Sequence, residues 1–188
     1  MFRGILKRIV ALVSQPGKAW LCLADEERDK ERFLSRYVYP LIGMVALAAF
    51  IAVFFTRKEF DFELALKSSI KSLIAAFGGF YLAVYLLNDI WERFFKREKD
   101  LTQWMFFVGY SSSLMFAMNI VLALLPEFFF LKLFVLYTVY IVWEGAEPYM
   151  RVAEAEKMKF VVITTAVILI MPAIIELGLF LLMPGLRI

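Results

Sequence analysis

The chain has 188 residues, of which 62% are hydrophobic, 17% aromatic and 21% charged. A soluble domain is usually about 45–50% apolar, so the excess indicates a membrane protein. With no histidine and a single cysteine, the chain cannot build a His-based triad, a Cys/His zinc site or an intrachain disulfide. We therefore expect no enzyme activity, no metal and no cofactor. The net charge of +3 argues against a nucleic-acid partner.

The N-terminal segment, residues 1–36, is predicted to be a cytoplasmic amphipathic and linker region. It opens with MFRGILKRIVALV, which places apolar side chains on one helical face and Arg3, Lys7 and Arg8 on the other. Because Lys7 and Arg8 interrupt the apolar run, the segment is unlike a cleavable signal peptide. Such a helix, with Trp20 behind it, is predicted to face anionic lipid headgroups. The alternative is that the same face packs on the protein's own cytoplasmic surface.

The remaining residues, 37–188, are predicted to form a bundle of five transmembrane helices. The fold class is therefore an all-α, polytopic membrane protein with an N-terminal amphipathic helix. Spans of roughly 20 apolar residues fit the hydrocarbon core, and the predicted ones are residues 38–55, 70–91, 101–125, 128–143 and 160–183. The fourth would cover only about 24 Å, so we expect it to extend into its flanks or to thin the bilayer locally. Residues 56–69 are predicted to form a charged connection.

Three local patterns inside the spans bear on packing. Ala75 and Gly79 stand four residues apart, a spacing that lets a second helix approach closely. Pro172 predicts a kink in the fifth span. The serine run 111–113 has no histidine to act as its base, so we interpret it as interhelical hydrogen bonding rather than as a nucleophile. We expect no catalytic residues.

The distribution of basic residues predicts the orientation. With the N-terminus inside, 15 of the 21 Lys and Arg residues lie on the cytoplasmic side and 6 on the other. The positive-inside rule then predicts a cytoplasmic N-terminus and an extracytoplasmic C-terminus.

Three polar residues interrupt the apolar spans: Asn119, Lys132 and Glu176. Counted from the helix ends at 1.5 Å per residue, all three fall at a similar depth, roughly 6–10 Å inside the extracytoplasmic ends. An intramembrane charge is costly and usually finds a partner or water. One hypothesis is that Glu176 pairs with Lys132 and that Asn119 bridges them. The alternative is that Lys132 extends to the headgroups and Glu176 is protonated or reaches water alone.

Four short motifs, in this order and in a five-span frame, resemble the Yip family of Ypt/Rab-interacting membrane proteins, in particular its bacterial branch. They are Pro16-Gly17-Lys18-Ala19-Trp20, Arg36-Tyr37-Val38-Tyr39-Pro40-Leu41, Gly109-Tyr110-Ser111, and Leu136-Tyr137-Thr138-Val139-Tyr140 continuing to Glu144-Gly145 and Pro148-Tyr149. The chain departs from eukaryotic members in lacking an Asp-Leu-Tyr-Gly-Pro motif, and Leu114-Met115 stands where a proline is expected. Binding of a Rab GTPase is therefore not part of what the resemblance implies here.

The resemblance implies a non-catalytic, membrane-organising or adaptor protein, multi-pass in a bacterial inner membrane. It would bind membrane lipids, a protein partner or a second copy of itself through cytoplasmic elements. These are the N-terminal helix and a cytoplasmic motif of Tyr137, Glu144, Gly145, Glu147 and Pro148. The alternative function is a small transporter, channel or transporter subunit that uses Asn119, Lys132 and Glu176 as an intramembrane polar site.

Overall fold

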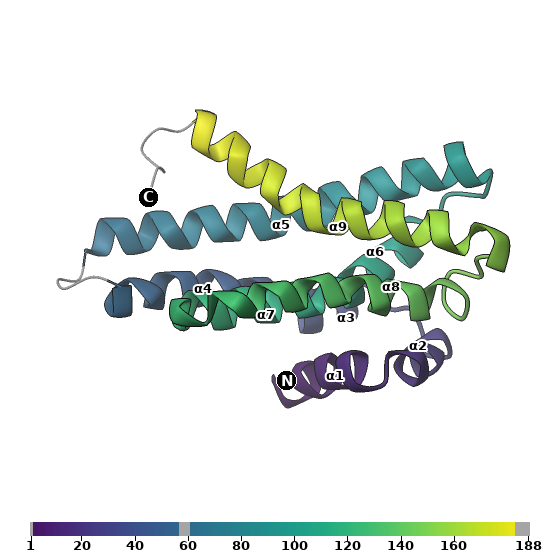
Figure 1. The fold of residues 1–188 in the computed structure, drawn as a ribbon, viewed down its shortest axis with the longest axis horizontal. Coiled ribbons are helices and arrows are strands. Elements are labelled where there is room, and N and C mark those ends of the chain that lie inside the picture. Colours follow the sequence, from purple (N-terminus) through teal and green to yellow (C-terminus); the bar gives the residue numbers. More distant parts are fainter. Residues whose placement is uncertain (1, 57–60, 183–188) are drawn as a thin grey trace.

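The computed structural model describes residues 2–56 and 61–182, and in these ranges the chain is helical (Figure 1). Two short helices, α1 (Phe2–Ser14) and α2 (Pro16–Ala24), lie outside a bundle of long ones. The bundle consists of α3 (Lys30–Phe33), a π-helical turn η1 (Leu34–Val38), α4 (Tyr39–Thr56), α5 (Phe62–Phe95), α6 (Leu101–Ser111), α7 (Ser113–Leu124), a 3₁₀ stretch η2 (Pro126–Tyr137), α8 (Thr138–Ala146) and α9 (Glu154–Leu182).

Five continuous helices in the described part of the chain are long and apolar enough to cross a membrane, as the composition predicts. They are Lys30–Phe55, Phe62–Phe95, Leu101–Leu124, Pro126–Ala146 and Glu154–Leu182. The protein is therefore an all-helical, multi-pass integral membrane protein. The amphipathic N-terminal helix forms as well, over Phe2–Ser14.

The second and fourth helices are longer than the predicted spans. Most of the connection expected over 56–69 is helix, because Asp61 caps α5 by accepting a hydrogen bond from the Leu64 N–H at 3.0 Å; residues 57–60 lie outside the described residues. The fourth helix begins with η2, and a 3₁₀ helix rises about 2.0 Å per residue. Together η2 and α8 span roughly 37 Å, which removes the expected shortfall.

The helices α5 and α9 cross where a glycine meets a proline. A Cβ added to Gly79 would lie 2.7 Å from the Pro172 Cα, so the two backbones are in direct contact. This is the close approach that the Ala75–Gly79 spacing predicts. Beyond Pro172, α9 bends away from α5 (Figure 1).

An aromatic core fills the end of the bundle that carries α1, α2 and the 96–100 and 147–153 connections; we call this the α1–α2 end. Trp91 and Trp104 meet edge to face with ring centroids 5.6 Å apart, and both contact Phe160 of α9. These side chains are at most 5% exposed. These three aromatic side chains therefore pack against one another inside the bundle.

Candidate functional site

The α1–α2 unit is held on the bundle by Trp20. Its ring is fully buried, stacks on Phe107 of α6 with centroids 4.8 Å apart, and lies against Tyr149 at 5.1 Å. Its indole Nε1–H donates a hydrogen bond to the Ile141 carbonyl of α8 at 2.8 Å. Because a buried tryptophan needs a partner for this N–H, the contact fixes both the depth and the direction of the ring.

Two glycines allow α2 and α8 to approach at this point. A Cβ on Gly145 would come within 2.5 Å of the Trp20 ring, and a Cβ on Gly17 within 2.7 Å of the Glu144 carboxylate. Gly145 has no room for a larger side chain unless α2 and α8 separate, because the Trp20 ring is buried and cannot move aside. At Gly17 the Glu144 carboxylate, which ends a flexible side chain, would have to turn away. The interface between α2 and α8 thus depends on a small residue at position 145.

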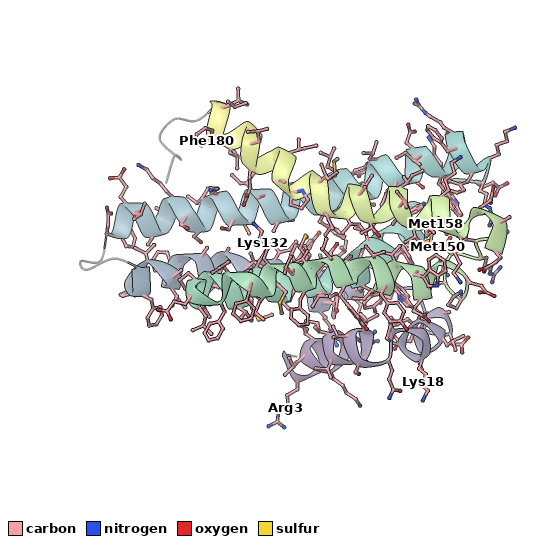
Figure 2. The ribbon with its side chains drawn as sticks, in the orientation of Figure 1. Arg3, Lys18, Lys132, Met150, Met158 and Phe180 are labelled. Carbon is pink, nitrogen blue, oxygen red and sulfur yellow. The ribbon has the colours of Figure 1, made fainter. Side chains whose placement is uncertain are left out.

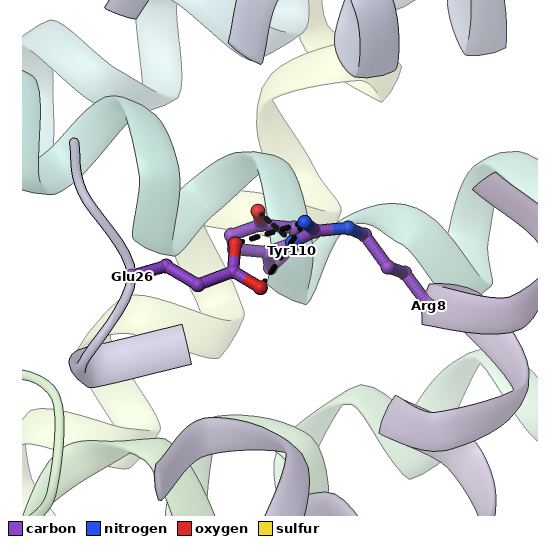
Figure 3. Close-up of polar contacts among 3 residues, drawn as sticks. All are labelled: Arg8, Glu26 and Tyr110. Atoms are coloured by element: carbon purple, nitrogen blue, oxygen red, sulfur yellow. Dashed lines mark hydrogen bonds and ion pairs between the residues drawn. The ribbon is translucent and has the colours of Figure 1, made fainter. Parts of the chain in front are cut away.

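The helix α1 is held against the bundle by one polar network and by part of its apolar face. Arg8 Nη1 donates to the Tyr110 hydroxyl at 2.6 Å, and Nη2 donates to both carboxylate oxygens of Glu26 at 2.8 and 3.1 Å (Figure 3). Burial alone would lower the pKa of Arg8, but Tyr110 and Glu26 outweigh it and the pKa is raised. Ile5 and Leu12 of the same helix are buried against the bundle.

A cleft of about 750 Å³ opens beside this network, between α1 and the start of the first membrane helix. Arg8, Arg32 and Arg36 line it together with Glu26, and Phe106 and Tyr110 are among its aromatic lining residues. Arg32 and Arg36 stand one helical turn apart. The cleft is therefore an amphiphilic groove with charges of both signs at its edge.

The residues predicted to face lipid divide into two groups. Trp20 is buried in the protein and does not face lipid, so for this residue the prediction is wrong. Arg8 is half-buried, with its guanidinium bonded to Tyr110 and Glu26. The cause is that α1 and α2 pack on the bundle, which is the alternative that the sequence leaves open. Arg3 and Lys7 are exposed, and Figure 2 shows Arg3 and Lys18 pointing away from the bundle.

A second cleft, of about 420 Å³, lies among α4, α5, α7, η2 and α9, towards the end opposite the α1–α2 end. Asn119, Lys132 and Glu176 all line it, so the structure brings together the three polar residues that the sequence singles out; Figure 2 labels Lys132, well away from α1 and α2. The direct pair is not formed. Both side chains are described, and no hydrogen bond or ion pair joins Lys132 to Glu176.

A comparison against known families covers all four sequence motifs. The sequence model of the family described as the Yip1 domain matches residues 10–176. The chain belongs to the Yip1 domain family. No curated protein and no solved structure matches it.

In this Yip1 domain, the four motifs that are distant in sequence converge at the α1–α2 end. Trp20 of the first motif contacts Tyr110 of the third and Tyr149 of the last. Tyr37 of the second motif packs on Tyr110 with centroids 5.1 Å apart and shares a hydrogen bond of 2.7 Å with Ser113. The serine run therefore makes the interhelical hydrogen bond expected of it, at Ser113.

The predicted cytoplasmic motif of the Yip1 domain is largely covered by the N-terminal unit. The Tyr137 hydroxyl donates to the Val13 carbonyl of α1 at 3.0 Å, and Gly145 is buried under Trp20. Glu144 and Pro148 are partly buried, and Glu147 is exposed, 3.7 Å from the Lys157 ammonium. Most of this motif holds α1 and α2 in place, which leaves little of it free to contact another molecule.

Sequence reasoning misses the partners of this docking site. Phe107, Ile141 and the Phe33–Phe106 stack, at 4.2 Å between centroids, carry no motif of their own. The Asp61 cap of α5 is a signal that could be read from the sequence, since an aspartate before Phe-Glu-Leu is a usual helix start, but it lies outside this docking site. Among the residues that the structure describes, no group of three or more Cys, Asp or Glu could hold a metal ion.

Proposed function

We propose that this Yip1-domain protein is a non-catalytic membrane-organising protein that binds anionic lipid through the outward face of α1 and α2. The observation that carries the proposal is a second apolar stripe on these helices that the bundle leaves uncovered. Leu6 is 63% exposed, Val10 55% and Leu21 58%. Exposed cations, Arg3, Lys7 and Lys18, accompany this stripe.

An uncovered apolar stripe flanked by cations is the pattern of a helix that lies in the headgroup layer. The apolar side chains would enter the acyl region, while each cation near an anionic surface contributes about 1 kcal/mol. In this arrangement the α1–α2 end is cytoplasmic, which agrees with the excess of Lys and Arg on that side. The protein would thereby hold its cytoplasmic end against one leaflet.

Lipid contact can be measured on the full-length protein in nanodiscs. With Cys22 replaced by serine, a single cysteine is placed at Leu6 or Val10 and labelled with an environment-sensitive fluorophore. Gly4 is the matched control, because it lies on the opposite side of α1, lines the first cleft and has open space around an added Cβ. Lipids with a nitroxide on the acyl chain should quench the label at positions 6 and 10 and spare position 4.

The charge part of the proposal is tested in the same samples. Replacing Arg3, Lys7 and Lys18 by glutamate should weaken quenching at position 6 in discs that contain anionic lipid, and raising the salt concentration should do the same. Equal quenching at positions 4, 6 and 10 would show that α1 does not enter the membrane, and the proposal would then be rejected.

A further inference from the structure

The second cleft holds two opposite charges that do not neutralise each other. Lys132 and Glu176 line the same cavity of about 420 Å³ with no hydrogen bond or ion pair between them, and neither has such a partner elsewhere in the described residues. Both lie inside apolar helices, where an unpaired charge is costly. A site in which two such charges are kept apart is suited to a ligand that satisfies both.

The surroundings of the cleft indicate that its occupant arrives from the membrane. Phe129 lines the cleft and is 75% exposed. Leu133, next to Lys132, is 69% exposed, and Leu177, next to Glu176, is 58% exposed. Inside apolar membrane helices, such side chains face acyl chains. A molecule that brings a polar group between Lys132 and Glu176 would therefore have its apolar part placed against these residues.

We propose that the second cleft binds the headgroup of a zwitterionic phospholipid with a primary ammonium, that is, a phosphoethanolamine lipid. Lys132 donates to the phosphate oxygens, and the ligand's ammonium donates to the Glu176 carboxylate and to the Asn119 side-chain carbonyl. Ala75, Ala76 and Pro172 are small or rigid wall residues that leave the space open. The site is separate from the lipid-contact face of α1 and α2.

The charge arrangement also determines which lipids are disfavoured. An anionic phosphatidylglycerol would satisfy Lys132 but would leave Glu176 unpaired beside a phosphate. A phosphatidylcholine carries both charges, but its quaternary ammonium has no N–H to donate to Glu176 or Asn119. The cleft should therefore rank phosphatidylethanolamine above both, by about tenfold, since one charge-assisted hydrogen bond is worth about that factor.

The experiment measures lipid retention by the purified full-length protein, using native mass spectrometry with the three lipids in competition. All samples carry Arg3→Glu, Lys7→Glu and Lys18→Glu, so that anionic lipid held by α1 and α2 is not counted, and this background serves as the wild type for the cleft. It should retain phosphatidylethanolamine. Glu176→Gln should reverse the ranking in favour of phosphatidylglycerol, because the repelling carboxylate is gone, and Lys132→Met should lose both lipids about tenfold or more. The gain of phosphatidylglycerol binding by Glu176→Gln is a result that a misfolded variant cannot give.

Matched controls remove the same charges near the cleft but outside it. Glu127→Gln and Lys71→Met change residues next to Pro126 and Ser72, and neither lines the cavity. Both should keep the wild-type ranking. The proposal is overturned if wild type retains phosphatidylcholine equally well, prefers phosphatidylglycerol, or retains no lipid, or if Glu176→Gln and Lys132→Met behave as wild type.

Discussion

Replacing Trp20 by alanine should release α2 from the bundle without unfolding the membrane helices. The side chain is fully buried, stacks on Phe107 and donates a hydrogen bond to the Ile141 carbonyl at 2.8 Å. Removing a buried tryptophan costs about 3–5 kcal/mol, of which about 1 kcal/mol is the hydrogen bond. The population in which α2 is undocked should therefore rise at least about a hundredfold.

Hydrogen exchange of the α2 amides, Pro16–Ala24, measures this population in the full-length protein in detergent. Leu21→Ala is the matched control, because Leu21 neighbours Trp20 on the same helix and is 58% exposed. Exchange in α2 should accelerate in Trp20→Ala, remain near wild type in Leu21→Ala, and stay slow in the cores of α5 and α9 in both variants.

A double-mutant cycle identifies the contact itself. Gly145→Ala would place a Cβ 2.5 Å from the Trp20 ring, and such overpacking costs about 1–3 kcal/mol. In the Trp20→Ala background the ring is absent, so the same change should cost almost nothing. The reasoning is refuted if Gly145→Ala is as costly without the tryptophan as with it, or if Trp20→Ala exchanges no faster than Leu21→Ala.

Three further predictions follow from other parts of the structure. Gly79→Ala should destabilise the protein by about 1–3 kcal/mol, because the added Cβ would clash with the Pro172 backbone. Gly78→Ala should be nearly neutral, because its Cβ would meet Ile175 at an ordinary 3.6 Å. Thermal melting in detergent compares the two variants. Burial raises the pKa of Tyr149 to about 12 against an ordinary 10.0. The stability that this buried, protonated phenol contributes is therefore fully present below pH 10 and is lost as the pH rises towards 12. The difference in phenolate absorbance between wild type and Tyr149→Phe follows this titration. A reporter fused to the C-terminus should be extracytoplasmic, and a cytoplasmic signal would reverse the proposed orientation.

The membrane helices could be predicted from the sequence because the thickness of the hydrocarbon core sets how many apolar residues each one needs. A span needs roughly 20 apolar residues, and charged connections separate the apolar stretches clearly. Their ends could not be predicted as well, since caps and 3₁₀ segments extend helices beyond the apolar run. Phe62 begins α5 eight residues before the predicted span because Asp61 caps it, and η2 begins at Pro126.

The docking of α1 and α2 could not be predicted because an amphipathic helix has the same pattern whether it covers lipid or protein. What decides the outcome for Trp20 is a set of residues far away in sequence: its hydrogen-bond acceptor, Ile141, is 121 positions along the chain. The glycine that makes room for the ring, Gly145, is one of nine in the sequence. The periodicity of a sequence shows that one face of a helix is apolar, but only the folded structure shows whether protein or lipid covers that face.

Because an amphipathic helix can pack on either protein or lipid, one helix can present apolar side chains to the bundle on one side and to its surroundings on the other. The apolar face of α1 is wide enough that Ile5 and Leu12 pack on the bundle while Leu6 and Val10 remain exposed. A free amphipathic helix must fold as it binds a membrane, which reduces its affinity. Here the bundle already holds α1 folded, through Arg8 and Trp20, so the exposed stripe can bind lipid without that cost. The proposed contact of Leu6 with lipid should therefore weaken in Trp20→Ala, although this tryptophan is fully buried in the protein.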